Sequence, residues 1–250
     1  MISVSATSGP PVSGTRTGST LIIACGAIAH ELVELKDANH WEHIDIQCLP
    51  AHWHNTPELI TPGVEQKIQS YKDHYEHLFV AYADCGTGGT LDTLLARYDI
   101  ERLPGAHCYS FFAGSSVFDD MADSQPGTFY LTDFLLDHFD RLVIDALGLN
   151  TYPELRDQYF GNYTRLMYLR QQTQGNKSQL RTLKAQAAAR ALSLPLTIHD
   201  TGLEPFEKAL LPVQVPIDKA MLRNIIKPYA QPAERQDPTV EIRNPSTGSQ

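Results

Sequence analysis

The chain has 250 residues, of which 42% are hydrophobic and 20% charged, and its formal net charge is −9. This composition is that of an ordinary globular protein with room for one large domain or two small ones. The negative charge and the lack of any basic run argue against a nucleic-acid-binding surface. No apolar run approaches the roughly 20 residues that cross a bilayer, so we expect no membrane span.

The N-terminus, MISVSATSGPPVSGTRTGST, is rich in small and polar residues and lacks the apolar core of a signal peptide. We therefore expect a cytoplasmic protein. Its four cysteines are expected to be free or to bind metal, because disulfides are rare in a reducing compartment. Residues 1–18 and 232–250 are expected to be disordered tails on either side of a single domain over residues 19–231.

The first half of the chain alternates short apolar runs with amphipathic segments. Strands are predicted at residues 21–24, in the alternating run HIDIQC and in the run HLFVA. A helix is predicted after each of these strands. A shorter unit, IERLPGAHCYSFFAG, is expected to give a brief extended piece and then a helix from Ser110 onward.

Three helices are predicted in the second half, over residues 131–147, 153–172 and 178–192. A late strand, PLTIHDTG, and a short helix, GLEPFEKALL, are expected to follow. Strands that alternate with helices indicate a parallel sheet covered on both faces. The sequence thus predicts an α/β, Rossmann-like three-layer core with a parallel sheet of about four to six strands and a helical C-terminal half.

Cys25, Cys85 and Cys108 share one local context, in which an extended segment leads to the cysteine, to small or turn residues, and then to a helix. Loops of this kind lie at the carboxyl edge of a parallel sheet, where such folds build their sites. A nearby helix N-terminus is expected to lower the pKa of each thiol. Three adjacent thiolates would repel one another without a cation, so their convergence would imply a metal ion.

The alternative for each of these cysteines, taken singly, is a small core residue, and no CxxC pair is present. It is the repeated placement that favours a metal site. Cys48 is different, because the alternation of its strand predicts that it is buried in the core.

The stretch YADCGTGGTLD, residues 82–92, has the outline of a phosphate-binding loop. It does not fit G-x-G-x-x-G, because Leu91 stands where the third glycine belongs, and it lacks the Lys-Ser/Thr ending of a Walker A loop. We interpret it as a thiolate loop whose glycines let the backbone approach a metal, with a phosphate at the helix start as the alternative.

The segment PAHWHNTPE places His54 in a proline-bounded loop at the same sheet edge, where it is a candidate fourth ligand or acid/base. The alternative is a histidine on a surface loop. Asp84 is expected to orient a ligand or carry protons, and His107 is a further acid/base candidate beside Cys108. The residues expected to contact a small-molecule substrate are Asn55, Gly86, Thr87, Gly88, Gly89 and Tyr109.

The motifs ACGAIAHEL, LPAHWHNTPE, ADCGTGGTLD, PGAHCYSFFAG, GTFYLTDFLLDHFDRLVI and ELRDQYFGNYTRLMYL together resemble an uncharacterised family of bacterial and archaeal proteins, classed as a domain of unknown function. The resemblance covers roughly residues 20–210. Other members usually carry Leu where this chain has Trp53. Genes of the family are often found near corrinoid-dependent methyltransferases, which implies a link to methyl-group or one-carbon metabolism.

Two classes of function follow. In the first, the protein is a metal-dependent enzyme in which zinc, held by the three cysteines, keeps an open position that activates a thiol or a water. A [4Fe–4S] cluster with three cysteine ligands and one free iron fits the same residues. In the second, the protein is a metal-binding accessory protein that docks on a corrinoid protein or methyltransferase.

Overall fold

The computed structural model describes residues 16–214, and all of them belong to one compact unit. The strands of this part of the chain are β1 (Arg16–Cys25), β2 (Ile44–Leu49), β3 (Tyr75–Ala81), β4 (Glu101–Arg102), β5 (Thr128–Leu131), β6 (Arg165–Arg170) and β7 (Leu196–Asp200).

The α-helices of the same part are α1 (Ala29–Ala38), α2 (Ile60–Tyr71), α3 (Thr90–Tyr98), α4 (Cys108–Ala113), α5 (Ser115–Ser124), α6 (Asp133–Asp137), α7 (Leu155–Phe160), α8 (Gly175–Leu192), α9 (Glu204–Ala209) and α10 (Leu211–Gln214). Three short 3-10 turns and one π-helical segment complete it: η1 (Gly26–Ile28), η2 (Ala51–Asn55), η3 (Pro57–Leu59) and η4 (Asp140–Asp145).

The first four strands form one parallel sheet in the order β2-β1-β3-β4. After β2 the chain returns to the other side of β1 to place β3, so the winding changes direction between β1 and β3. In open parallel sheets the ligand crevice lies at the carboxyl ends of the strands that flank such a switch point. Cys25 is the last residue of β1, and Cys85 lies in the loop that follows β3.

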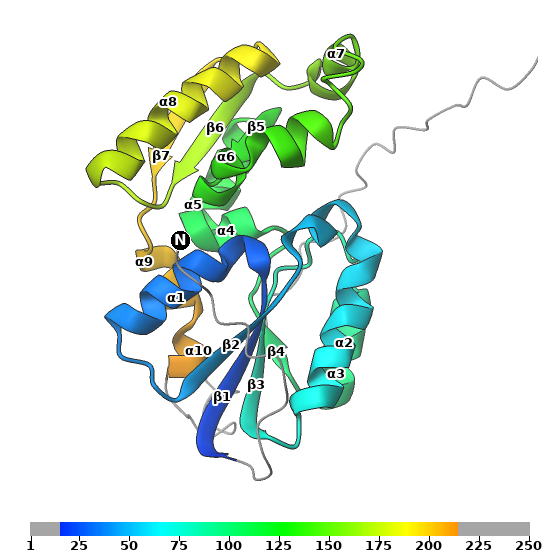
Figure 1. Ribbon diagram of the computed structural model, residues 1–250, viewed down its shortest axis with the longest axis vertical. Helices are drawn as coiled ribbons and strands as arrows, with labels where there is room; N and C mark the ends of the chain where they lie inside the picture. Colours follow the sequence, from blue (N-terminus) through cyan, green and yellow to red (C-terminus); the bar gives the residue numbers. More distant parts are fainter. Residues whose placement is uncertain (1–15, 215–250) are drawn as a thin grey trace, which may run out of the picture. The chain divides into compact units, whose positions relative to one another are not determined.

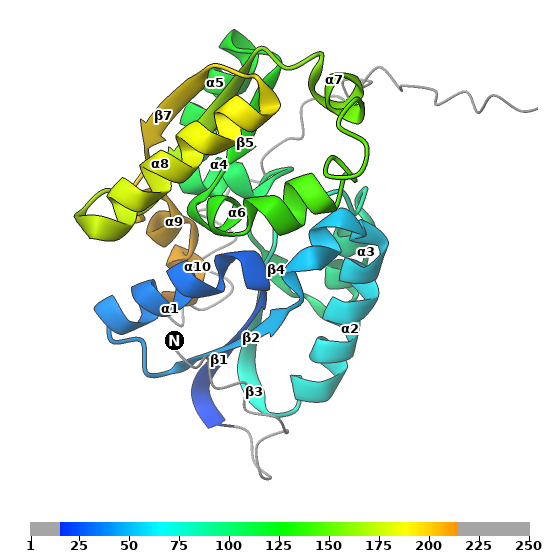
Figure 2. The same ribbon diagram turned by 45° about the horizontal axis from the view of Figure 1, so that its top comes forward.

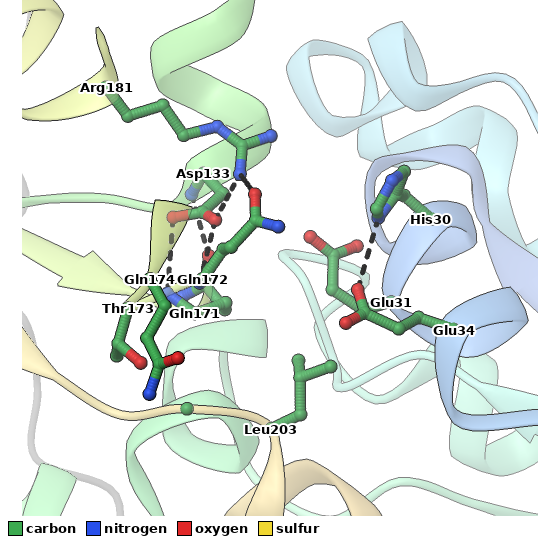
Figure 3. A pocket seen from close by; sticks show the side chains of 11 residues that line it. His30, Glu31, Glu34, Asp133, Gln171, Gln172, Thr173, Gln174, Arg181 and Leu203 are labelled. Atoms are coloured by element: carbon green, nitrogen blue, oxygen red, sulfur yellow. Dashed lines mark hydrogen bonds and ion pairs between the residues drawn. The ribbon is translucent and has the colours of Figure 1, made fainter. Parts of the chain in front are cut away.

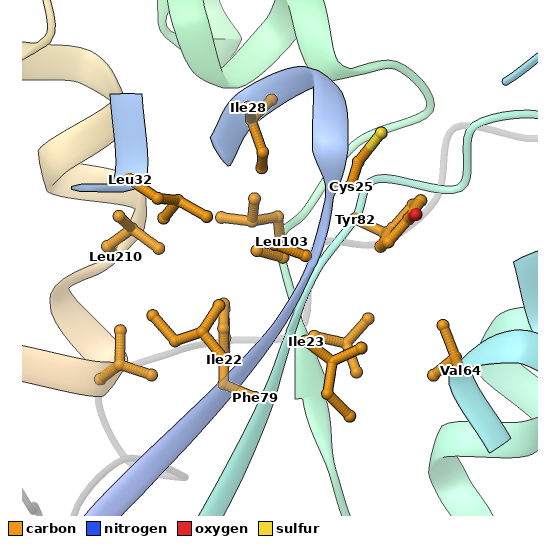
Figure 4. Close-up of a cluster of buried hydrophobic side chains, with 14 of the residues drawn as sticks. Ile22, Ile23, Cys25, Ile28, Leu32, Val64, Phe79, Tyr82, Leu103 and Leu210 are labelled. Atoms are coloured by element: carbon orange, nitrogen blue, oxygen red, sulfur yellow. The ribbon is translucent and has the colours of Figure 1, made fainter. Parts of the chain in front are cut away.

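Helices cover both faces of this sheet: Figure 1 shows α1 along one face and α2 and α3 along the other. The run Leu21–Ala24 of β1 is buried throughout, as expected for a central strand that is covered on both sides. Leu32 of α1 and Val64 of α2 belong to the same core (Figure 4). The predicted α/β fold with a Rossmann-like parallel sheet is confirmed.

The C-terminal half adds a second parallel sheet, in the order β5-β6-β7, along which α8 lies (Figure 2). Leu166 and Tyr168 of β6 pack in a cluster with α6 and α8. Met167 and Leu169 of the same strand pack in a cluster with α4 and α5. The four side chains therefore alternate between two buried faces, which is the pattern of a central strand.

The helix predicted over residues 153–172 is wrong in its second half, because α7 ends at Phe160 and β6 follows. A short apolar run such as RLMYLR fits a buried strand as well as a helix, and only its two neighbouring strands decide between them. The predicted helix over residues 131–147 is also divided, since β5 ends at Leu131 and α6 and η4 are separate segments.

β1 begins at Arg16, inside the stretch 1–18 that is predicted to be a tail. The rest of that stretch, the predicted tail at 232–250 and the predicted domain end at 231 lie outside the described residues. Between residues 16 and 214, no helix is long and apolar enough to cross a membrane.

Candidate functional site

Cys25 lies where β1 gives way to η1. It is 7% exposed, and its Sγ accepts a hydrogen bond from the backbone N–H of Ala27 at 3.4 Å. Tyr82, the residue after β3, lies beside this thiol (Figure 4), and burial followed by the charge of Cys25 raises the pKa of its hydroxyl. The hydroxyl has no hydrogen-bond partner of normal geometry within the described residues. Tyr82 is not among the site residues predicted from the sequence.

The loop after β3 holds Cys85 in an unusual backbone conformation. Cys85 has φ +51°, in the left-handed region that residues other than glycine rarely adopt, and it is followed by Gly86 at φ +85°. Gly88 and Gly89 also have positive φ, at +60° and +80°. The glycines therefore let the chain turn, while Cys85 itself accepts a strained conformation, a feature that clusters at functional sites.

The carboxylate of Asp84 organises this loop from inside. It accepts hydrogen bonds from Thr87 Oγ1 at 2.6 Å, from the N–H of Gly89 at 3.0 Å and from the N–H of Gly88 at 3.2 Å. Burial raises the pKa of Asp84, but these bonds outweigh it and the net shift is downward. The two glycine N–H groups already donate to the carboxylate of Asp84. The loop therefore binds an anion of its own chain, and these donors are not available to a phosphate.

Two backbone hydrogen bonds tie this loop to the segment that carries Cys108. The N–H of Asp84 donates to the carbonyl of Gly105 at 3.0 Å, and the N–H of Cys85 donates to the carbonyl of Ala106 at 2.8 Å. Cys108 begins α4 two residues later. The second and third predicted thiols are therefore brought together by local backbone pairing.

The three thiols share one electrostatic neighbourhood. Burial raises the pKa of Cys25, raises that of Cys85 to about 12 and raises that of Cys108 well above its ordinary value. Cys25 adds to the shift on Cys85, and both add to the shift on Cys108. The expected lowering of the thiol pKa by helix N-termini is wrong for these thiols as they stand, because desolvation outweighs the helix dipole.

The loop that carries His54 lies against the thiol loops. A Cβ on Gly86 would lie 3.1 Å from Cγ of Pro57, and a Cβ on Gly26 would lie 2.9 Å from the carbonyl oxygen of Leu49. Trp53 packs on α2, where a Cβ on Gly63 would meet its ring. Bulky Trp53 thus helps to fix η2 over a glycine of the next helix.

His54 is half-buried, and its pKa is lowered by burial and then by the nearby charge of His107. The two histidines are therefore within electrostatic range of each other. Asn55 and His107 are exposed, and Thr87 is buried within the loop. Tyr109 packs its ring against Phe118 and Tyr130 at centroid distances of 6.2 and 5.5 Å, which places it in the aromatic cluster under β5.

Cys48, expected in the core, is half-buried and packs against the edge of the main apolar cluster. Burial, and to a smaller extent the charge of Cys25, raises the pKa of the Cys48 thiol to about 11. In the part of the chain that the structure describes, no three or more His, Cys, Asp and Glu side chains are arranged as a metal site. The binding of one ion by Cys25, Cys85 and Cys108 therefore stays a prediction.

A cavity of about 370 Å³ lies at the carboxyl ends of the second sheet, where no site was predicted; it is called the polar cavity because most of the residues that line it are polar or charged. Asp133, 1% exposed, follows β5 and is the centre of its hydrogen bonds. Asp133 accepts from the Tyr168 hydroxyl at 2.6 Å and from Arg181 at 2.5 Å. The signal that was available is an acidic residue two positions after a strand. It was hidden because β5 was not predicted and a helix was expected to begin at Leu131, the last residue of that strand.

Comparison with known proteins places the chain in a family without assigning an activity. The family model described as "Protein of unknown function (DUF1638)" matches residues 48–210. No curated protein and no solved structure matches the chain.

Proposed function

Since the chain belongs to the DUF1638 family of proteins of unknown function, we propose from its own residues that it is a metal-dependent enzyme. Cys25, Cys85 and Cys108 are the proposed ligands of a zinc ion that keeps one coordination position open. His54 is the proposed fourth group, as an acid/base beside the open position; as a fourth ligand it would instead fill that position and have to leave it for a substrate to bind.

One observation supports this proposal: three thiols from distant positions in the chain influence one another electrostatically near the carboxyl edge of the first sheet. Cys25 ends β1, Cys85 follows β3, and the backbone bond from Cys85 to Ala106 holds the approach to Cys108 beside them. Buried thiols whose pKa is raised are protonated and unreactive at neutral pH. A bound cation reverses that preference, because a coordinating thiol is deprotonated outright.

The residues around the thiols have separate tasks in this proposal. Bound zinc with an open position would lower the pKa of a coordinated thiol or water and make a nucleophile at neutral pH. Asp84 positions the loop through Thr87, Gly88 and Gly89, so we assign it to orienting Cys85 rather than to carrying protons. His54 and His107, which influence each other electrostatically, are the groups assigned to accept the released proton.

For the reaction we propose transfer of a methyl or other one-carbon group to a substrate thiol. A methylated corrinoid is the proposed donor class: its carbon–cobalt bond breaks, cobalt keeps the electron pair, and a carbon–sulfur bond forms. The thiol loses its proton in the same overall step. The reason for this choice is the family that the motifs resemble. Genes of that family are often found near corrinoid-dependent methyltransferases.

The test is the metal content of protein purified without added metal and under anaerobic conditions. We expect close to one metal ion per chain in the wild type, most of it lost in Cys85→Ser and all of it kept in Cys48→Ser. Cys48 is the matched control because it is a half-buried cysteine of β2 that contributes no proposed ligand. A colourless zinc protein supports the proposal, whereas a brown protein with iron and sulfide replaces zinc by a [4Fe–4S] cluster.

Full metal content in Cys85→Ser overturns the proposed site. So does a wild-type protein that neither contains metal nor binds added zinc or reconstituted iron and sulfide. In either case the phosphate-loop interpretation of CGTGGT becomes the first choice, and binding of nucleotides to the wild type is the measurement that follows.

A further inference from the structure

The polar cavity at the second sheet is built by segments that are distant in sequence. Its floor comes from the residues that follow β5, β6 and β7, including Asp133, the loop at residues 171–174 and Leu203. Its other wall is α1, which contributes His30, Glu31 and Glu34 (Figure 3). Carboxyl ends of parallel strands are where α/β folds bind ligands, so the position alone makes this cavity a candidate site.

The positive charge of Arg181 in this cavity is already engaged. Its guanidinium donates to Asp133 at 2.5 Å and to Asp137 at 2.6 and 3.0 Å, and also to the side-chain oxygen of Gln172 at 3.2 Å. Asp133 receives further bonds from the backbone N–H groups of Gln171 and Gln172 at 3.2 and 3.0 Å. This network is nearly saturated, so Arg181 is not poised to hold an anionic ligand.

Glu31 is the residue that the network leaves out. Its side chain lines the cavity from α1, the residue is only 5% exposed, and its Oε2 has no hydrogen-bond partner among the described residues. Burial raises the pKa of this carboxyl to about 7, followed by smaller effects that include the charge of Asp133. A buried carboxylate oxygen without a partner is costly, which makes it a strong candidate for contact with a ligand.

We propose that this cavity binds a small organic molecule with a primary ammonium group, and that the ammonium pairs with Glu31. An ammonium group supplies three donors, and the unpartnered Oε2 supplies the acceptor that matches one of them. Glu34 on the same helix and Asp133 on the opposite wall give the cavity an excess of negative charge over Arg181. A carboxylate or phosphate ligand would meet three acidic groups and one guanidinium that is already paired.

Charged groups face Glu31 from each element around it. On α1 they are His30 and Glu34, which lie 3.7 Å apart. Asp133 faces it from α6, Arg181 from α8, and Glu31 also acts on the thiol of Cys108 at the start of α4. The amine site thus lies within electrostatic range of Cys108 but is lined by none of the three cysteines, and the proposal does not rest on a metal ion being bound by them.

The test is calorimetric titration of the full chain with a series of primary amines, such as propylamine, phenethylamine and putrescine. Each amine is matched with the alcohol and the carboxylate of the same carbon skeleton. The measurements are made at about pH 8, where Glu31 is mostly ionised because its pKa is raised to about 7. We expect at least one amine to bind while its alcohol and carboxylate do not. Glu31→Gln is expected to weaken that binding by about ten- to a hundredfold, the usual effect of losing a charge-assisted hydrogen bond.

Two controls make the result specific. Glu42→Gln, the same substitution at an exposed residue, should leave the affinity unchanged. Cys85→Ser should keep the amine affinity, so that failure of the proposed metal site and failure of the amine site are separate outcomes. The inference is overturned if no amine binds better than its alcohol, if the carboxylates bind best, or if Glu31→Gln binds the amine as the wild type does.

Discussion

The backbone N–H of Cys85 donates a hydrogen bond to the carbonyl of Ala106 at 2.8 Å, and Cys85 makes this bond with φ at +51°. A residue with a Cβ is held in a left-handed conformation at the point where two segments of the site are joined. The conformation costs about 1–2 kcal/mol for a residue other than glycine. The fold thus keeps a cysteine where glycine would be the less strained choice.

This strain gives a prediction that does not need a metal. Cys85→Gly should be more stable than Cys85→Ala by about 1 kcal/mol in the free energy of unfolding, because glycine relieves the left-handed strain and alanine keeps it. Urea denaturation of metal-free protein measures the difference. The same pair at Cys48, in the extended strand β2, should show the reverse order. Equal stabilities of Cys85→Gly and Cys85→Ala would mean that the backbone there is unstrained.

Gly86→Ala should be more destabilising than Gly88→Ala. Both positions have positive φ, at +85° and +60°, so both substitutions introduce left-handed strain. Only at Gly86 does the new Cβ also approach Cγ of Pro57, at 3.1 Å, whereas nothing lies within 4 Å of a Cβ on Gly88. We expect the difference in unfolding free energy to be about 1 kcal/mol, measured in urea. A larger loss in Gly88→Ala would contradict the contact between the Cys85 loop and the His54 loop.

Glu31→Gln should change how stability depends on pH. An acid whose pKa is raised on folding, here from 4.5 to about 7, contributes stability below pH 4.5 that is lost as pH rises through 7. The wild type should therefore lose up to about 3 kcal/mol of unfolding free energy over this interval relative to Glu31→Gln. Urea denaturation at several pH values measures it, with Glu42→Gln as the exposed control. Parallel stability curves for wild type and Glu31→Gln would contradict the burial of an ionisable, unpartnered carboxyl.

Arg181→Met should be far more destabilising than Arg170→Met. Asp133, the partner of Arg181, is 1% exposed, so loss of the guanidinium leaves a buried carboxylate without its counter-ion. We expect a cost of about 3–5 kcal/mol for Arg181→Met. Arg170 pairs with Asp200, whose side chain is 52% exposed, and a pair of that kind contributes about 1 kcal/mol or less. Thermal or urea unfolding of both variants checks this order, and similar losses would contradict it.

The sequence by itself determined the first half of this protein. The apolar runs at Leu21–Ala24 and at residues 78–81 are strands because each is short, apolar throughout and followed by small residues and a helix. Cys25 and Cys85 follow these strands, so their place at the carboxyl edge of the sheet was predictable from local pattern alone. The glycines of CGTGGT likewise predicted a tight turn, and all three have positive φ.

The late strand in PLTIHDTG was predicted and is β7, but tertiary structure alone decided that β5 and β6 join it in a second sheet and that a polar cavity forms there. Residues 165–170 are a strand only because β5 and β7 lie on either side to pair with them, and no local pattern contains that information. Glu31 falls on the same buried helical face as Ile28 and Leu35. A charged residue on an apolar face is a sequence signal of a buried polar site. Glu31 is buried in a cavity that Asp133 and Arg181 also line, and these two residues pair with each other and not with Glu31. Both lie about a hundred residues or more away in the sequence. Burial and charge pairing are properties of contacts between distant segments, and for that reason the sequence named the thiols but not the carboxyl that faces the cavity.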